Sequence, residues 1–155
     1  MSTAEKAQAI GVDRLRTSAL SRDLNFLLAR ANALALAAAN SALAEHGLKP
    51  RSYSVLALAA DDALPTQREL AEFLRLDPSQ IVAIVDDLER RGLVERRPDP
   101  TDRRANVVVA TEAGRALFAR AQKSTRAVER ALKAAVPPED RERLGELLRQ
   151  LAFRE

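Results

Sequence analysis

Arginine is the residue whose chemistry stands out between Glu89 and Arg104, where six arginines occur with four acidic residues. A guanidinium is planar, always charged and rich in hydrogen-bond donors, so it suits contacts to phosphates and to base edges. The local excess of positive charge is small, and the whole chain carries a net charge of only +3. By charge alone, a surface that binds a polyanion and an ordinary solvated surface are equally good interpretations.

Few residues offer catalytic or metal chemistry. The chain has one histidine, no cysteine and no glycine-rich phosphate loop, and no histidine or cysteine pair has the spacing of metal ligands. Ser54 and Ser79 have no histidine near them in the sequence. The carboxylates of Asp61-Asp62 and of Asp86-Asp87 are adjacent, so on a helix they diverge by ~100°. We therefore expect a protein that is not an enzyme and that has no cofactor, metal or disulfide.

A first short helix is predicted to begin at Thr66. Thr66-Gln67-Arg68-Glu69 fits the S/T-x-x-E capping box, in which two free backbone amides are satisfied reciprocally. Leu70, Ala71, Phe73 and Leu74 then give this helix a side that faces the core. Only Arg75-Leu76 separates it from the next helix, a gap that suits a helix-turn-helix.

The second helix of this pair is predicted to begin at Asp77. Asp77 suits the N-cap, Pro78 suits the first helical position, and Gln80 is placed to reach back to the Asp77 amide. An apolar stripe at i, i+3, i+4 and i+7 follows in Ile81, Ile84, Val85 and Leu88. Gly92 suits the left-handed position that ends a helix.

The next segment predicts a β-hairpin. Residues 93–97 and 106–110 are strand-like, and residues 98–104 contain two prolines and turn-forming aspartates. Thr111 is placed to cap a further helix. A hairpin with a charged tip after a helix-turn-helix is a winged helix-turn-helix. In that arrangement one helix enters a DNA groove and the hairpin reaches the neighbouring groove.

Helical periodicity covers most of the remaining chain. Residues 13–45 predict one long helix, 50–60 a shorter one, 111–135 a second long one and 139–153 the last, while 63–65 suggests a short third strand beside the wing. The buried positions predicted for residues 111–135 are Ala116, Leu117, Ala121, Val128 and Leu132.

The first long helix predicts a dimer. A helix of ~33 residues is ~50 Å long, and one small lobe cannot cover its apolar stripe. We expect the terminal helices to pack against their counterparts in a second chain, and a two-fold dimer is the commonest closed assembly. Such a dimer places two DNA-reading helices ~34–36 Å apart, about one turn of DNA.

The predicted fold class is mainly α, an α+β winged helix-turn-helix with six helices and a two- or three-stranded wing. Residues 1–12 are expected to be a flexible extension, 13–46 with 111–155 the helical dimerisation region, and 47–110 the DNA-binding region. No signal peptide is visible, and residues 26–43, the most apolar stretch, are interrupted by Arg30, Asn32, Asn40 and Ser41. A soluble cytoplasmic protein without a membrane partner is therefore expected.

These residues resemble the MarR family of bacterial transcription regulators over about residues 13–151. The resemblance rests on Gln67-Arg68-Glu69-Leu70-Ala71, on Leu88-Glu89-Arg90-Arg91-Gly92-Leu93-Val94, and on a wing pattern. That pattern consists of Arg97, Asp99-Pro100, Asp102-Arg103-Arg104 and Thr111-Glu112-Ala113-Gly114. The resemblance implies a homodimeric repressor that binds double-stranded, pseudo-palindromic operator DNA and is often released by a small ligand.

The resemblance also implies roles for individual residues. Residues 77–91 look like the recognition helix in the major groove. Arg104 matches the wing arginine that enters the minor groove, and Asp102 matches the acid that holds it in place. Narrow A·T-rich minor grooves attract arginine. Arg97 and Arg103 are candidates for phosphate contacts, which position a protein without reading sequence.

The middle of the recognition helix departs from the family, because Val82-Ala83 replace polar or basic residues and Asp86-Asp87 follow. We expect the two aspartates to lie away from the DNA backbone, or one to pair with Arg90, itself a candidate DNA-binding residue. Base reading would then fall to Ser79 and Gln80, with Val82 or Ala83 on thymine methyls. For Gln80, reading and capping are equally good interpretations.

Family members often bind small aromatic or anionic effectors between the dimer helices and the DNA-binding lobe. In this chain the matching polar residues are His46, Arg51 and Tyr53. The alternative is that His46 only ends a helix and that Tyr53 is a core residue with a bonded hydroxyl. A second alternative, for the whole chain, is a helical dimerisation or adaptor protein without specific DNA binding.

Overall fold

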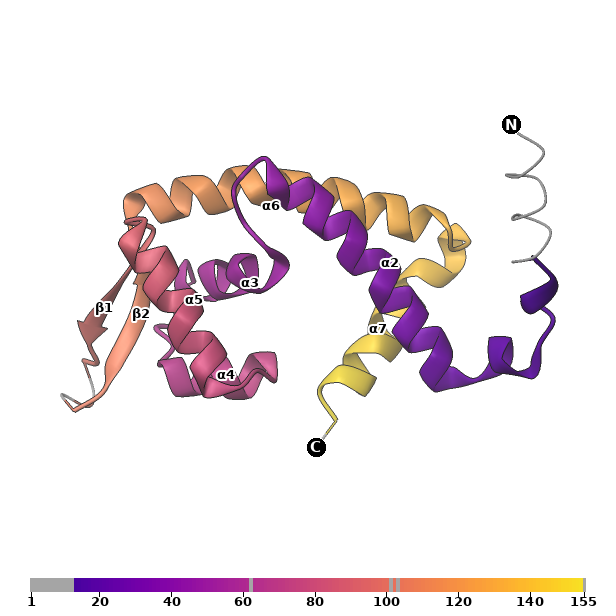
Figure 1. Ribbon diagram of the computed structural model, residues 1–155, viewed down its shortest axis with the longest axis horizontal. Coiled ribbons are helices and arrows are strands. Elements are labelled where there is room, and N and C mark those ends of the chain that lie inside the picture. The colour runs from indigo at the N-terminus through magenta and orange to yellow at the C-terminus, as the bar shows by residue number, and fades with distance from the viewer. Residues whose placement is uncertain (1–12, 62, 101, 103, 155) are drawn as a thin grey trace. The chain divides into compact units, whose positions relative to one another are not determined.

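The computed structural model describes residues 13–61, 63–100, 102 and 104–154 (Figure 1). The named elements, in chain order, are the 3-10 helix η1 (Ala19–Arg22), α2 (Leu24–Ala44), α3 (Pro50–Ala59), α4 (Gln67–Leu74), α5 (Pro78–Arg90), the strands β1 (Val94–Pro98) and β2 (Asn106–Ala110), α6 (Glu112–Ala134), the 3-10 helix η2 (Pro138–Asp140) and α7 (Arg141–Ala152). This mainly helical chain with a two-stranded wing confirms the predicted fold class. The expected flexible extension, residues 1–12, lies outside the described residues.

The chain divides into two compact units, one ending at Ala37 and one running from Ala38 to Glu155. The second unit holds the helix-turn-helix, the hairpin and both C-terminal helices. The functional division into residues 13–46 with 111–155 and residues 47–110 stays a prediction.

The single long helix expected over residues 13–45 is wrong. The chain forms the short η1 and then an extended Asp23, and α2 begins only at Leu24. The Asp23 carboxylate accepts a hydrogen bond from the Phe26 amide at 2.8 Å, so it competes with a continuous helix by satisfying the start of a new one. At 21 residues, α2 is ~32 Å long rather than ~50 Å.

The most apolar stretch of the sequence, residues 26–43, lies within α2. By length and composition alone, Leu24–Ala44 is long and apolar enough to cross a bilayer, with a mean hydropathy of 1.3 in its most apolar stretch. Only 6% of its most apolar stretch is buried. A helix that is covered by other helices in a soluble assembly passes the same test. Length and composition therefore do not distinguish a helix in a membrane from a helix in such an assembly.

The helix-turn-helix forms as its capping signals predict. Thr66 accepts a hydrogen bond from the Glu69 amide, and the Glu69 carboxylate accepts one from the Thr66 amide, which completes the capping box of α4. Arg75 adopts the left-handed conformation, with φ of 52°, and so ends α4 within the two-residue turn. Leu70 and Ala71 are buried as expected, whereas Phe73 is 57% exposed and its ring lies 5.7 Å from that of Phe153.

The core of the second unit lies between α3, α5, the hairpin and the start of α6. Val55 and Leu56 from α3 and Ile81, Val85 and Leu88 from α5 are almost completely buried. The predicted apolar stripe of α5 therefore faces the core, with Ile84 partly buried beside it. Because that stripe is buried, the opposite face of α5 is exposed to solvent.

The wing is an antiparallel hairpin of β1 and β2 (Figure 1). In its register Val94 pairs with Ala110 and Pro98 with Asn106. The inner residues of β2, Val107 to Ala110, are buried and tie the hairpin to the core. The third strand suggested at residues 63–65 is reduced to one bridge between Thr66 and Val107, next to a hydrogen bond from the Val108 amide to the Pro65 carbonyl at 2.8 Å. Pro65 has no amide to donate, which limits any longer ladder.

The helix α6 begins where the sequence predicts, with Thr111 accepting a hydrogen bond from the Gly114 amide. Leu117 and Ala121 are buried and Val128 is partly buried, but Ala116 and Leu132 are exposed in the single chain, contrary to expectation. Four leucines of α7 are exposed as well: Leu144, Leu147, Leu148 and Leu151. These apolar side chains are only partly covered within the described residues of one chain.

Candidate nucleic-acid interface

The exposed face of α5 carries the side chains that are candidates for base contacts. Ser79, Gln80, Val82 and Ala83 are all exposed, because Ile81 and Val85 occupy the buried side of the same helix. The Ser79 hydroxyl donates to the Asp77 carboxylate at 2.5 Å, and the Ser79 amide donates to the same oxygen at 2.8 Å. Ser79 is therefore engaged in the N-cap of α5, and these bonds lower the pKa of Asp77 below its ordinary value.

The Gln80 side chain does not complete a capping box. Within the described part of the chain it makes no hydrogen bond, and the free amides at the start of α5 are served by Asp77 instead. Of the two interpretations of Gln80, the capping one is thus not realised. Its amide group remains available on the exposed face.

Both aspartates of α5 are paired, and one of them pairs with Arg90, as one of the two expected alternatives had it. Asp87 contacts Arg90 at 3.1 Å through i, i+3 spacing and Arg91 at 3.3 Å through i, i+4 spacing. Arg90 is nevertheless 72% exposed, so its guanidinium has room for a further contact. Asp86 pairs with Arg96 of the hairpin, which sequence reasoning did not single out.

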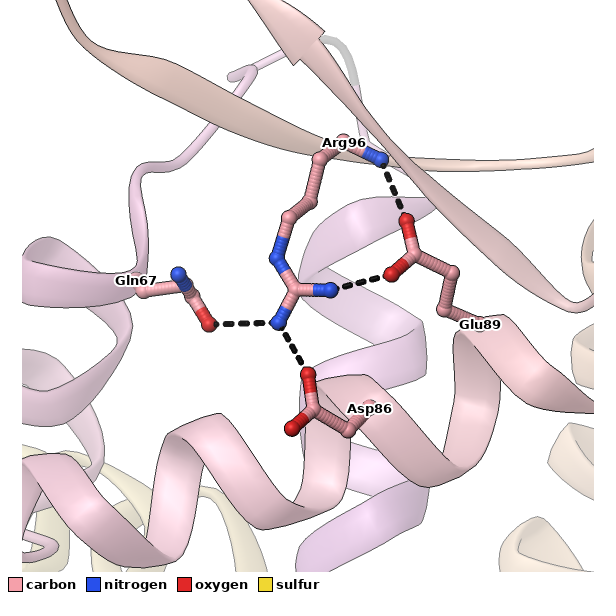
Figure 2. Close-up of polar contacts among 4 residues, drawn as sticks. All are labelled: Gln67, Asp86, Glu89 and Arg96. Atoms are coloured by element: carbon pink, nitrogen blue, oxygen red, sulfur yellow. Dashed lines mark hydrogen bonds and ion pairs between the residues drawn. The ribbon is translucent and has the colours of Figure 1, made fainter.

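Arg96 is the centre of a network that joins three elements (Figure 2). From β1 its guanidinium contacts the carboxylates of Asp86 and Glu89 on α5. It also donates to the Gln67 side chain on α4 at 3.1 Å, and its backbone amide donates to the Glu89 carboxylate at 3.1 Å. The hairpin is thereby attached to both helices of the helix-turn-helix.

The Arg96 guanidinium is held in its charged form. Partial burial acts to lower its pKa, but the hydrogen bond to Asp86 and the charges of Glu89 and Asp86 outweigh burial, so the pKa of Arg96 is raised. Its side chain is 23% exposed, against 60% for its neighbour Arg97. The only sequence signal for this difference is strand alternation, which places Arg96 and Arg97 on opposite faces of β1.

The tip of the wing is organised by Asp102. Its carboxylate accepts a hydrogen bond from the Arg104 backbone amide at 2.9 Å, and its own amide donates to the Asp99 carboxylate at 3.2 Å. Asp102 thus fixes the backbone around Arg104. Among the described residues, the Arg104 guanidinium is exposed and makes no bond of its own.

The other predicted wing residues differ in what the structure describes. Arg97 is exposed and paired with Glu95 on the same strand. Arg103, predicted to contact phosphate, lies outside the described residues.

The three candidate effector residues differ in their contacts: His46 and Tyr53 bond side chains of α6, and Arg51 is exposed. The His46 Nε2 atom lies 2.9 Å from the Ser124 hydroxyl of α6 and 3.3 Å from the Glu45 carboxylate. The Tyr53 hydroxyl lies 3.1 Å from the Thr125 hydroxyl, one residue further along α6. Arg51 is exposed. His46, in the turn after α2, and Tyr53 of α3 therefore both contact the long helix α6, whereas Arg51 makes neither of these contacts.

Within the described ranges, no group of three histidine, cysteine or acidic side chains is arranged to hold a metal ion. The geometry is that of a winged helix-turn-helix with one exposed helix face and one exposed arginine at the wing tip. These features define a DNA-binding regulator of transcription.

The chain belongs to the MarR family. The family pattern matches residues 46–105. A MarR-family transcriptional regulator from Rhodococcus sp. RHA1 is 41% identical, with a TM-score of 0.81, and the match covers 90% of this chain and all of that one. CouR from Rhodococcus jostii RHA1, solved with p-coumaroyl-CoA, is 43% identical, with a TM-score of 0.82 and coverage of 90% of this chain and 98% of that one.

Two further matches extend the comparison. The repressor CouR bound to a 23-mer DNA duplex is 33% identical, with a TM-score of 0.78 and coverage of 86% and 94%. A putative transcriptional regulatory protein for the hcr operon of Thauera aromatica is 31% identical over 105 residues, which are 68% of this chain. The chain spans 63% of the length of that curated relative.

Proposed function

We propose that this chain acts as a cytoplasmic homodimer that binds a pseudo-palindromic operator and represses nearby genes until a small aromatic or anionic ligand releases it. The observation that carries the proposal is the pairing of two exposed DNA-facing features in one motif. The polar start of α5 is free of the core, and Arg104 stands at the tip of a hairpin attached to the same helix. A related repressor has been solved on a DNA duplex.

The exposed leucines of α7 and the exposed Leu132 of α6 support the homodimer. A row of such residues on one monomer costs free energy in water at about 25 cal/mol per Å² of apolar surface. A two-fold partner presents the same residues and covers them. It also supplies the second recognition helix that a palindromic site requires.

In this proposal each candidate residue has one task. Gln80 reads a base edge in the major groove, Val82 and Ala83 contact thymine methyl groups, and Ser79 stabilises the helix start while facing the DNA. Arg104 enters the minor groove from a tip held by Asp102. Arg90, Arg97 and Arg103 contact phosphates, which contribute affinity without base preference.

The proposed effector is an aromatic carboxylate or its thioester with coenzyme A. The support is a relative, 43% identical, that has been solved with p-coumaroyl-CoA. In this chain His46, in the turn after α2, and Tyr53 of α3 contact α6, so a ligand that competes for their hydrogen bonds would change how the DNA-binding lobe is held. Arg51, exposed on α3, would pair with the anionic group.

A gel shift with the chain's own upstream intergenic DNA tests the proposal. Specific binding requires a shifted band that survives excess unrelated DNA and weakens as salt rises, because phosphate contacts release counterions. A thermal-shift screen of aromatic carboxylates and acyl thioesters then tests release. A compound that both stabilises the protein and removes the shifted band supports the sensor role, and a screen without such a compound contradicts it.

The adaptor function remains the second candidate, because α5 carries two aspartates and a glutamate near the surface that would face DNA. Their pairing with Arg90, Arg91 and Arg96 reduces the cost of bringing them near phosphates. A dimer that binds no upstream DNA at low salt would favour the adaptor.

A further inference from the structure

We infer that Arg96 is the residue that positions the wing on the recognition helix, so that Arg104 and the exposed face of α5 meet DNA as one unit. The inference rests on the proposed function, since it concerns how the two DNA-facing features are held together. It assigns to Arg96 a role different from that of the neighbouring wing arginines, which are candidates for direct DNA contact.

The hydrogen bonds of Arg96 leave it poorly placed to serve DNA. A guanidinium has five N–H donors. One terminal nitrogen contacts Glu89 and the other contacts both Asp86 and Gln67, so three of these donors are directed into the protein (Figure 2). The side chain is also the less exposed of the two adjacent arginines on β1.

The partners of Arg96 lie on the elements that the wing must be aligned with. Asp86 and Glu89 lie one turn apart on α5, and Gln67 lies at the start of α4. The hairpin is otherwise attached at its base, by the burial of Val94 on β1 and of Val107 to Ala110 on β2, and by the bridge from Val107 to Thr66. Arg96 lies further along β1 than Val94, so it fixes the strand beyond this base and with it the direction in which the tip extends.

Lysine would not replace arginine here. A planar fork reaches two carboxylates and an amide at once, whereas an ammonium is a compact charge without fixed directions. Loss of Arg96 also leaves Asp86 and Glu89 unpaired on the recognition helix. The loss of the contacts that hold the wing and the unpaired carboxylates would both weaken DNA binding. Only the loss of those contacts acts through Arg104.

A double-mutant cycle separates these consequences. We expect Arg96→Met to weaken operator binding about tenfold at fixed salt, a loss comparable to that of one specific arginine contact. If Arg96 acts by placing Arg104, the Arg96→Met/Arg104→Ala double variant binds within about twofold of the weaker single variant, because coupled residues are not additive. Losses that multiply instead, or Arg96→Met binding like the wild type, would overturn the inference.

Arg97→Ala is the matched control, because Arg97 is adjacent to Arg96, is exposed, and forms its ion pair with Glu95 of its own strand. The fold-losses of operator affinity caused by Arg97→Ala and by Arg104→Ala should multiply in the double variant. If Arg96→Met does not fold, judged by thermal unfolding, Glu89→Gln takes its place in the same cycle. Glu89→Gln keeps the shape of the side chain but removes one charge from the network. In its cycle with Arg104→Ala, a double variant within about twofold of the weaker single variant supports the inference, and losses of affinity that multiply overturn it.

A measurement without DNA keeps the inference separate from the proposed function. Hydrogen exchange at the hairpin amides, Val107 to Ala110, should be faster in Arg96→Met and unchanged in Arg97→Ala. If the wild type binds no DNA but exchange rises in Arg96→Met, the proposed function fails and the positioning role stands. Unchanged hairpin exchange in Arg96→Met would overturn the positioning role, whatever the DNA result.

Discussion

Gly114 lies directly against the Leu93 carbonyl: a β-carbon at position 114 would be 1.9 Å from that oxygen and 2.9 Å from its carbon. Leu93 precedes β1 and Gly114 lies in the first turn of α6, so this contact closes the base of the wing. The Thr111 side chain supports it by donating to the Gly92 carbonyl at 2.7 Å while capping α6. A threonine and a glycine three residues apart thus hold the hairpin against the long helix.

Gly114→Ala should destabilise the protein by about 2 kcal/mol or more, because backbone has to move to admit the methyl group. The measurement is the free energy of unfolding in urea. Gly145→Ala is the control, since in the single chain nothing lies within 4 Å of its new methyl group and alanine favours a helix. Equal stabilities of the two variants would contradict the close approach at Gly114.

Arg104→Ala should lower operator affinity most where the sequence flanking the half-sites is A·T-rich. The reason is that a narrow minor groove has an enhanced negative potential, which an inserted guanidinium exploits. The test is a titration at one fixed salt concentration against two operators that differ only in A·T or G·C flanks. Loss of equal size on both operators would mean that Arg104 contacts phosphate only.

Gln80→Ala should change base preference at one position of each half-site, by about 1–3 kcal/mol at that position. The Gln80 amide is exposed and not used for capping, so in the proposed complex it is free to bond a base edge. The measurement is binding to a set of operators that each carry one changed base pair. A uniform loss across the set would show that Gln80 does not read sequence.

Tyr53→Phe should cost about 1 kcal/mol of stability, the usual net contribution of one hydrogen bond. The ring contact between Tyr53 and Phe118, with centroids 5.7 Å apart, is kept in this variant. Thr125→Val removes the other partner of the same bond, so its effect and that of Tyr53→Phe should not add. If Tyr53 also transmits the ligand signal, Tyr53→Phe should shift the ligand concentration needed for release.

Acid should weaken the two helix caps of the helix-turn-helix. Hydrogen bonds from the Thr66 amide and hydroxyl lower the pKa of Glu69 below its ordinary value of 4.5, and those from Ser79 lower that of Asp77 below 3.8. A lowered pKa in the folded state means a contribution to stability that is present above the unfolded-state pKa and is lost as the pH falls through the folded-state value.

Glu69→Gln tests the acid effect, because glutamine keeps the capping geometry without a titrating group. Between about pH 6 and about pH 3 its unfolding free energy should fall less steeply than that of the wild type. If the unfolding free energies of Glu69→Gln and of the wild type fall equally steeply with pH, the Glu69 carboxylate does not contribute to the acid sensitivity of folding.

Local signals in the sequence were enough for the helix-turn-helix and the wing. Thr66, Asp77 and Thr111 each cap the helix that they were predicted to cap, since such contacts depend on residues only two or three positions apart. The pairing of Asp87 with Arg90 has the same local origin. The break at Asp23 shows the limit, because helical periodicity runs through this position and does not reveal that its carboxylate begins a new helix.

Contacts between distant residues could not be predicted in the same way. The network at Arg96 joins residues 7, 10 and 29 positions away, and the bonds from His46 and Tyr53 to α6 span more than 70 positions. Composition and spacing do not fix such distances. The exposed Leu132 and Phe73 belong to the same class, since a helical stripe does not reveal whether its cover comes from the same chain.

The most direct test of sequence-specific operator binding by the dimer is fluorescence anisotropy of the full chain on a labelled duplex of its own upstream region, at near-physiological salt. We expect one dimer per duplex and an affinity at least about 10³-fold higher than for a scrambled duplex of the same composition. Equal affinity for the two duplexes, or binding by a monomer, would contradict sequence-specific binding by the dimer.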